Sequence, residues 1–322
     1  MRDNSNMIDD PLSDVLELAD TQSVLVGGFT AGGSWALRFP SPDKLKFFVL
    51  VKGGCWLCID GEEPVHIEAG DVLLLSAQRS YVLAGDLAAT PIDALTVFTG
   101  KVKTARLGER EDCIQIGGHI LLDPTSGRIL ADVLPPLIHV RADSSRATVL
   151  QWLLEQLIRE QAAELPGGSL ATKQLAQLMF LQILRIHLAA SGPLAAGWLR
   201  AVTDPRLAPA LRLMHGHPEQ SWELEDLAKA AGMSRTTFAV HFKAIAGVAP
   251  LAYLTQWRMR LAQRALREGD IPVSVLAGKF GYGSESAFSN AFKRVIGQAP
   301  KHYRNVARMD GHANGAAQTI VT

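Results

Sequence analysis

The sequence has few cysteines, no long uninterrupted hydrophobic run and no net charge. Three cysteines in 322 residues are too few for the disulfide framework of small secreted domains, which favours a reducing compartment. The longest apolar stretch, from Leu178 to Ala190, is interrupted by Gln182, Arg185 and His187, and the N-terminus lacks the apolar core of a signal peptide. The sequence therefore predicts a cytoplasmic protein without a membrane span.

The neutral total hides an uneven distribution of charge. From Leu199 to Met309 there are 16 Lys and Arg against 8 Asp and Glu, whereas from Met1 to Trp198 there are 16 against 23. A basic C-terminal part attached to an acidic body is typical of a protein that binds nucleic acid, although a lopsided charge is often only a solvated face.

The first part of the chain has the pattern of a β-domain. Between about Val24 and Val97, short apolar runs alternate with turn residues, and Asp60-Gly61 and Ala69-Gly70-Asp71 indicate tight turns. The chain is also long enough for two domains with separate cores. We expect an all-β barrel or sandwich here, within the stretch 1–144.

The pattern changes to a helical period in the stretch 145–190. Apolar residues recur there every three and four positions, with a break at Leu165 to Gly168, which predicts two helices. Because both are apolar over more than one face, they are expected to pack on the β-domain and on a second subunit, with Leu153 and Leu157 in the dimer contact. Residues 191–204 are predicted to be a linker, and residues 309–322 a polar tail.

The C-terminal part contains two copies of one unit. Ten positions of the first copy have the same residue in the second, 49 residues later before the turn and 50 residues later after it. The matched pairs are Leu227 and Leu276, Ala228 and Ala277, Gly232 and Gly281, Ser234 and Ser284, Phe238 and Phe288, Phe242 and Phe292, Lys243 and Lys293, Gly247 and Gly297, Pro250 and Pro300, and Tyr253 and Tyr303.

Each copy carries the signals of a helix, a tight turn and a second helix. Gly232 and Gly281 suit the left-handed residue that ends the first helix, and Ser234 and Ser284 suit the N-cap of the second. Such a short connection sets two helices at the steep angle of a helix-turn-helix. We therefore predict an all-α domain over 205–308 that binds double-stranded DNA with two such units.

The second helix of each copy has one apolar face, and its opposite face is the predicted DNA contact. Arginine on that face suits guanine, asparagine suits adenine, and glutamate suits the amino group of cytosine. The predicted contacts are Arg235, Thr236, Ala239, Val240 and Lys243 in the first copy and Glu285, Ser286, Ser289, Asn290 and Lys293 in the second.

Between the copies, residues 250–268 have the spacing of a single helix. Nineteen residues span roughly 28 Å, close to the ~34 Å of one turn of DNA, so the two units can enter successive segments of the major groove. The alternative is a helical bundle whose Phe pairs are only core. Two aligned copies, a spacer of this length and the local positive charge argue against that alternative.

These motifs resemble the AraC/XylS family of transcriptional regulators over roughly 205–304. The resemblance is carried by LAKAAGMSRTTFAVHFK, YLTQWRMRLAQRAL and GYGSESAFSNAFKRVIGQAPKHYR. It implies the same DNA contacts except Lys243 and Lys293, which rest on the helix pattern alone. A homodimer and, for an activator, RNA polymerase are the further partners expected. Ala239 and Val240 depart from the family, where polar residues are common, which leaves Arg235 as the main polar contact of the first unit.

The N-terminal segments KFFVLVKGGCWLCIDGEEPVHIEAGDVLLL and LPPLIHV resemble a cupin-type sensory domain. That resemblance implies a small β-barrel with a pocket for an unknown small-molecule effector. The candidate contacts are large or polar residues of the predicted strands: Trp35, Arg38, Lys46, Phe48, Trp56 and Arg79.

Many cupins are metalloenzymes, but the ligand pattern is missing from this sequence. A cupin metal needs His-x-His with a carboxylate and a later His, whereas no His lies between Pro40 and Val65 and Tyr81 stands near the place of the later one. We expect no metal, no cofactor and no catalytic residues. The remaining histidines are expected to be isolated: His66, His119, His139 and His187.

The cysteines are expected to be structural. Cys55 and Cys58 form a C-x-x-C pattern, but residues i and i+3 of a strand point to opposite faces, so their sulfurs diverge. Cys113 stands alone. The leading hypothesis is an effector-responsive homodimeric transcription factor; the alternatives are a cupin enzyme with recruiting helices and a regulator whose barrel serves only for dimerisation.

Overall fold

The computed structural model describes residues 10–76, 79–99, 104–123, 127–131, 133–163, 165–190 and 197–307. They divide into a barrel unit, within 20–123 and 127–192, and a helical unit, which contains the C-terminal residues from 197 onward. Residues 10–19 belong to the helical unit, although the sequence-based division placed them in the sensory domain. The expected order of an all-β domain, two helices and an all-α domain is confirmed.

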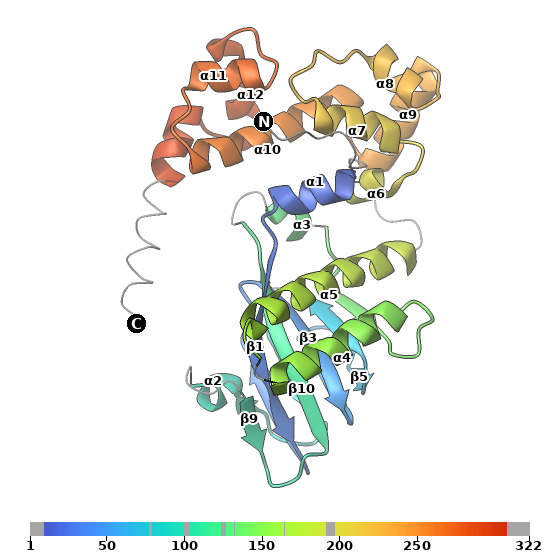
Figure 1. The fold of residues 1–322 in the computed structure, drawn as a ribbon, viewed down its shortest axis with the longest axis vertical. Coiled ribbons are helices and arrows are strands. Elements are labelled where there is room, and N and C mark those ends of the chain that lie inside the picture. The colour runs from blue at the N-terminus through green and yellow to red at the C-terminus, as the bar shows by residue number, and fades with distance from the viewer. Residues whose placement is uncertain are drawn as a thin grey trace. The chain divides into compact units, whose positions relative to one another are not determined.

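The barrel unit is built on two sheets (Figure 1). The first has the strand order β11-β6-β3-β10-β1-β9 and the second β5-β4-β7-β2-β8. The elements of this β-domain are β1 (Gln22–Ala31), β2 (Ala36–Phe39), β3 (Leu45–Lys52), β4 (Gly54–Ile59), β5 (Val65–Glu68), β6 (Val72–Leu75), β7 (Tyr81–Ala84), β8 (Ile92–Asp93), α2 (Ala94–Val97), β9 (Thr104–Leu107), β10 (Cys113–Leu121), α3 (Arg128–Ala131) and β11 (Leu137–Val140).

The core of the barrel unit lies between the inner faces of the sheets. Phe48 and Leu50 of β3 and Leu57 of β4 belong to one buried cluster, because alternate residues of a strand face the same side. The expected turns are present: Gly61 has φ +86° and Gly70 has φ +90°, a conformation that disfavours a Cβ atom.

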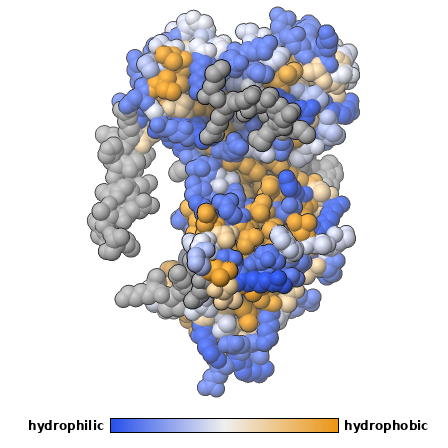
Figure 2. Space-filling model, viewed as in Figure 1, coloured by the Kyte–Doolittle hydropathy of each residue, from blue (hydrophilic) through white to orange (hydrophobic). Residues whose placement is uncertain are grey.

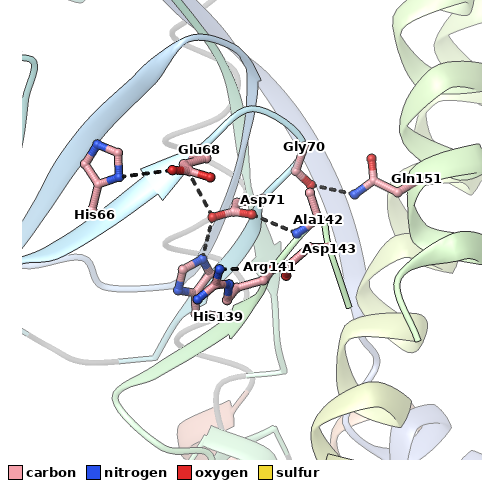
Figure 3. Close-up of polar contacts among 9 residues, drawn as sticks. All are labelled: His66, Glu68, Gly70, Asp71, His139, Arg141, Ala142, Asp143 and Gln151. Atoms are coloured by element: carbon pink, nitrogen blue, oxygen red, sulfur yellow. Dashed lines mark hydrogen bonds and ion pairs between the residues drawn. The ribbon is translucent and has the colours of Figure 1, made fainter. Parts of the chain in front are cut away.

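Helices α4 (Thr148–Ala163) and α5 (Gly168–Ala190) confirm the predicted helical pair, and they cover one face of the first sheet (Figure 1). A polar network around the buried Asp71 fixes the chain near α4 (Figure 3). The Asp71 carboxylate accepts from the backbone N–H of Ala142 at 2.8 Å and lies 2.8 Å from Nε2 of His139. Gln151 of α4 donates to the Gly70 carbonyl at 2.6 Å, so the turn that contains Asp71 is also joined to the helix.

The helical unit comprises α1 (Pro11–Leu18), α6 (Trp198–Thr203), α7 (Ala208–Gly216), α8 (Leu224–Ala230), α9 (Arg235–Ala246), α10 (Pro250–Glu268), α11 (Val273–Lys279) and α12 (Glu285–Ile296). The bounds of α10 are those expected from the sequence. Val15 and Leu18 bury the apolar face of α1 within this unit.

In the part of the chain that the structure describes, no single helix is long and apolar enough to cross a membrane. Helices α9 and α10 meet the criteria of length and composition only as a pair, bent by 52° at their junction.

Candidate nucleic-acid interface and barrel cavity

The two helix-turn-helix units are α8 with α9 and α11 with α12. Gly232 follows α8 with φ +64°, and Gly281 follows α11 with φ +78°. Each glycine is in the left-handed conformation that ends the first helix of its unit. Ser234 accepts from the Thr237 backbone N–H at 3.2 Å, and Ser284 accepts from that of Ala287 at 3.1 Å. These bonds satisfy N–H groups that the first turn of a helix leaves unpaired, so both predicted caps are present.

The core-facing sides of α9 and α12 carry pairs of aromatic rings. Phe238 and Phe242 are fully buried with their centroids 5.6 Å apart, and Phe288 and Phe292 are fully buried at 5.9 Å. Because these rings lie at i and i+4, they hold one side of each helix against its unit and direct the other side outward.

The outward face of α9 carries the predicted contacts of the first unit. Arg235, Thr236, Val240 and Lys243 are exposed, and Ala239 is half-buried. Val240 is 66% exposed, so it presents a branched apolar side chain on this face.

The outward face of α12 carries the predicted contacts of the second unit. Glu285, Ser286, Asn290 and Lys293 are exposed, and Ser289 is half-buried. Arg294 is a further exposed cation beside Lys293 that the sequence analysis did not select. The preference for cations in the last turn of a helix, where they complement its dipole, was the signal that could have found it.

Two of the predicted contacts have ion partners within the helical unit. Nη1 of Arg235 lies 3.0 Å from a carboxylate oxygen of Glu225, and a carboxylate oxygen of Glu285 lies 3.5 Å from Nζ of Lys301. Arg235 is 65% exposed, and pairs this exposed contribute only about 0–1 kcal/mol. Both side chains are therefore free to exchange these partners for a nucleic acid at little cost.

A cavity of about 340 Å³ lies in the barrel unit, with walls from both sheets and from α2. It falls in the size range of small-molecule sites, roughly 300 to 1,000 Å³. Its walls are mainly apolar and aromatic, and its polar side chains are Lys46, Tyr81, Gln115 and His119. Burial lowers the pKa of both Lys46 and His119, and it raises the pKa of the Tyr81 hydroxyl.

Of the six residues proposed to contact an effector, Lys46 and Phe48 line this cavity. Arg38 and Arg79 instead form exposed ion pairs, with Asp60 at 3.3 Å and with Glu62 at 2.7 Å. They do so because Arg38 alternates with the inward Leu37 and Phe39, and Arg79 precedes β7 beside the turn at Gly61.

The two tryptophans also lie outside the cavity. Trp35 is part of the barrel core, edge-on to Phe29 at 5.2 Å, and Trp56 packs on His66 at 4.8 Å on the opposite face of β4 from Leu57. The residues that sequence reasoning missed are Phe39, Tyr81, Phe98, Gln115 and His119.

Cys55 and Cys58 face opposite sides of β4, as predicted: Cys55 lies in the barrel core and Cys58 packs on a separate small cluster. Cys113 is not alone, because the Cys55 thiol donates a hydrogen bond to its sulfur. This bond raises the pKa of Cys55 and lowers that of Cys113. His139 and His119 are not isolated either; the first contacts Asp71 and the second lines the cavity.

No group of three or more His, Cys, Asp or Glu among the described residues is placed to hold a metal ion. The barrel unit thus holds a mainly apolar cavity with a few polar groups. The helical unit holds a pair of exposed helices, each able to present side chains to a groove.

Models of two protein families match the chain. A cupin domain matches residues 10–189, and a helix-turn-helix domain matches residues 227–305. The first covers α1, the β-domain, α4 and nearly all of α5, and the second covers α9 to α12 with most of α8.

Known proteins match over nearly the whole chain. A chain of Streptomyces antibioticus described as an AraC-like transcription regulator is 42% identical over 297 residues, which cover 92% of this chain and 98% of that one. The RCS-specific HTH-type transcriptional activator RclR of Escherichia coli is 27% identical, with 93% and 98% covered. Among solved structures, the DNA-binding domain of AdpA in complex with a target DNA is 35% identical, covers 34% of this chain and 96% of its own, and has a TM-score of 0.32. The relatives are regulators and not enzymes, and this chain belongs to the AraC-like family of DNA-binding transcription regulators.

Proposed function

We propose that this regulator reads DNA through the outward faces of α9 and α12 and is controlled by a small molecule bound in the barrel cavity. The observation that carries the DNA contacts is the pair of exposed faces, each opposite two buried phenylalanines and each starting at a serine cap. Helix starts and exposed polar side chains are the features that enter the major groove in helix-turn-helix proteins.

Within these faces, base reading is assigned to residues whose side chains fit base edges. Arg235 suits guanine O6 and N7, and Asn290 suits adenine N6 and N7. Thr236, Ser286, Ser289 and Glu285 add polar contacts, and Ala239 and Val240 provide apolar surface. Lys243 and Lys293, in the later turns of their helices, are assigned to phosphates.

The cavity supports control by an effector. It has the size and composition of a ligand site, and its walls come from both sheets and from α2. A ligand that binds one state of the regulator more tightly shifts its population toward that state. Filling the cavity should therefore change DNA affinity or activation without contacting the DNA.

A homodimer is proposed to form through α4 and α5. The exposed apolar side chains on these helices include Trp152 at 55%, Val149 at 51% and Leu178 at 47%, and hydrophobic residues gather over this part of the barrel unit (Figure 2). A groove of about 450 Å³ runs between the helices beside Trp152 and Leu178, with Arg159 and Glu160 also in its walls. Opposite charges on one patch suit a two-fold interface, because each finds its partner on the other copy.

The sequence-based choice of dimer contacts needs correction. Leu153 and Leu157 are 2% and 0% exposed, because they face the core of their own unit. Leu153 follows Trp152 and Leu157 follows Gln156, and Trp152 and Gln156 face the groove. One residue rotates an α-helix by roughly 100°, which is enough to separate the core face from the surface face. The proposed interface is therefore on the neighbouring face of the same helix.

The proposed setting is the cytoplasm, where the DNA partner is found, and the proposed mode is activation through RNA polymerase. RclR, a relative over nearly the full length, is named as a transcriptional activator, which supports that mode. The experiment is transcription in vitro from the gene's own upstream region with purified RNA polymerase. Rising transcript with added regulator supports activation, and falling transcript would make it a repressor.

A further inference from the structure

The barrel cavity contains a positive charge with no negative partner in its walls. Lys46 lines it, and none of the described lining residues is Asp or Glu. The carboxylate that acts on Lys46 is Asp43, which forms a 4.0 Å ion pair with Lys44. Burying an ammonium without a partner is costly, so an apolar cavity with such a group favours a ligand that brings the counter-charge.

Strand geometry directs Lys46 into the cavity. Lys46, Phe48 and Leu50 alternate along β3, and the last two belong to the barrel core. The ammonium lies 5.6 Å from the centroid of the Phe39 ring. On the neighbouring strand, Lys46 is paired in register with His119. Burial lowers the pKa of His119 and favours its neutral form, so His119 adds a polar group and not a second positive charge.

Apolar surface surrounds the charge. The rings of Phe39 and Tyr81 stack at 4.9 Å and 8°, and those of Phe48 and Tyr81 are parallel within 7° at 6.5 Å. The sheet that carries Lys46 and Phe48 also contributes Gly27 and Gly117 to the cavity wall, a register pair of β1 and β10.

The volume limits the ligand to a small one. At ~30 Å³ per water molecule, the cavity of about 340 Å³ equals roughly eleven waters. A molecule of about ten non-hydrogen atoms therefore fills it. A sugar would need several polar partners that the ring stack does not offer, and a hydrocarbon would leave the ammonium unpaired.

We propose that the cavity binds a small organic monocarboxylate, whose carboxylate pairs with the Lys46 ammonium and whose apolar body lies against Phe39, Phe48 and Tyr81. This ligand class rests on the proposed control by an effector, and it specifies the chemistry of that effector. Charge selects the head group and the stacked rings select the body, whether that body is aromatic or aliphatic.

The test measures binding of matched acids and amides to the full-length protein by titration calorimetry. The probes are 3-phenylpropionate and octanoate, each compared with its neutral amide. The variant is Lys46→Met, which keeps the length of the side chain and removes the charge. The control is Lys44→Met, which removes a lysine two positions away that does not line the cavity.

At least one acid is expected to bind at least tenfold more tightly than its amide, since a contact to a charged group is worth at least that factor. Lys46→Met should reduce the affinity for the acid to that for the amide, and Lys44→Met should leave it unchanged; thermal unfolding checks that both variants are folded. Which acid binds distinguishes an aromatic from an aliphatic body. Equal binding of acid and amide, unchanged acid binding by Lys46→Met, or no binding of either acid would overturn the proposal.

A separate variant keeps this result apart from the effector hypothesis. Ala94 of α2 is 2% exposed and lines the cavity, so Ala94→Leu fills part of it without changing any charge. If Ala94→Leu abolishes the regulator's effect on transcription of a reporter gene while the acids fail to bind, the effector hypothesis is supported and the assignment of a carboxylate ligand is wrong. If the reporter responds normally with the cavity filled, the effector hypothesis itself is wrong.

Discussion

The carboxylate of Asp14 lies 3.0 Å from Nδ1 of His215, 201 residues further along the chain. The His215 side chain is fully buried, its Nε2 lies 2.9 Å from the Tyr253 hydroxyl, and its ring stacks on Trp257 at 3.9 Å. Helix α1 thus completes the core of the unit that carries both helix-turn-helix motifs, although it precedes the barrel strands in the sequence.

Asp14→Ala should weaken the helical unit by about 1 to 3 kcal/mol, because it leaves a buried nitrogen of His215 without its partner. Hydrogen exchange of α7 and α10 in the full-length protein measures this as faster exchange. Glu17→Ala is the control: it removes the same charge from an exposed position on α1. Equal protection in both variants would show that the contact contributes nothing.

Asn290→Ala should weaken binding to the specific site by roughly 1 to 3 kcal/mol and binding to random DNA very little. Lys293→Ala should weaken binding to specific and to random DNA alike, because a lysine on a phosphate reads no sequence. It should also lower the slope of log K against log salt concentration by about one. Titrations on specific and random duplexes at several salt concentrations separate the two. If a folded Asn290→Ala protein retains its full preference, the base-reading face of α12 is misplaced.

Val240→Ser should reduce a preference for thymine at one position of the site by about 1 kcal/mol, because the exposed valine suits the thymine methyl group. Val275→Ser is the matched control, since Val275 is 55% exposed on α11 and outside both recognition helices. Selection of binding sites from random DNA measures the base preference at each position. An unchanged preference at every position would remove Val240 from the reading face.

Trp152→Glu should yield a folded monomer, because the charge replaces an exposed aromatic at the proposed interface. Leu153→Glu should instead unfold the barrel unit, since that side chain is 2% exposed within the core. Light scattering and circular dichroism distinguish the outcomes. Leu87→Glu, at a leucine of the barrel unit that is 53% exposed, is the control and should remain dimeric. A dimeric Trp152→Glu protein would place the interface elsewhere.

Local signals explain what the sequence predicted well. Helix α10 begins at Pro250 and ends at Glu268 as expected, because proline at the first position and the apolar spacing are both properties of that segment. The serine caps and the turn glycines are likewise defined by residues close together in the chain. The repeat then located the second unit from the first.

Contacts between strands that are distant in the chain could not be predicted from the sequence. Two examples are the register pair of Lys46 and His119 and the hydrogen bond between the Cys55 and Cys113 thiols. Both depend on how β3 and β4 lie against β10. The alternation of side chains along a strand could have excluded Arg38 from the effector contacts, because Leu37 and Phe39 on either side of it are apolar. No local pattern indicates that α1 packs on α7. Which of Leu153 and Trp152 faces the core could not be predicted either, because the two differ only by the rotation of one helical residue.

The most direct test of the account is a genome-wide footprint of the full-length protein, compared with that of an Arg235→Ala/Asn290→Ala variant. The wild type should protect discrete sites with two elements about one helical turn apart, roughly 10 base pairs, on one face of the DNA. The variant, which retains Lys243 and Lys293, should lose these sites and keep its weak binding to random DNA. Identical protected sites in wild type and variant would contradict the assignment of base reading to α9 and α12.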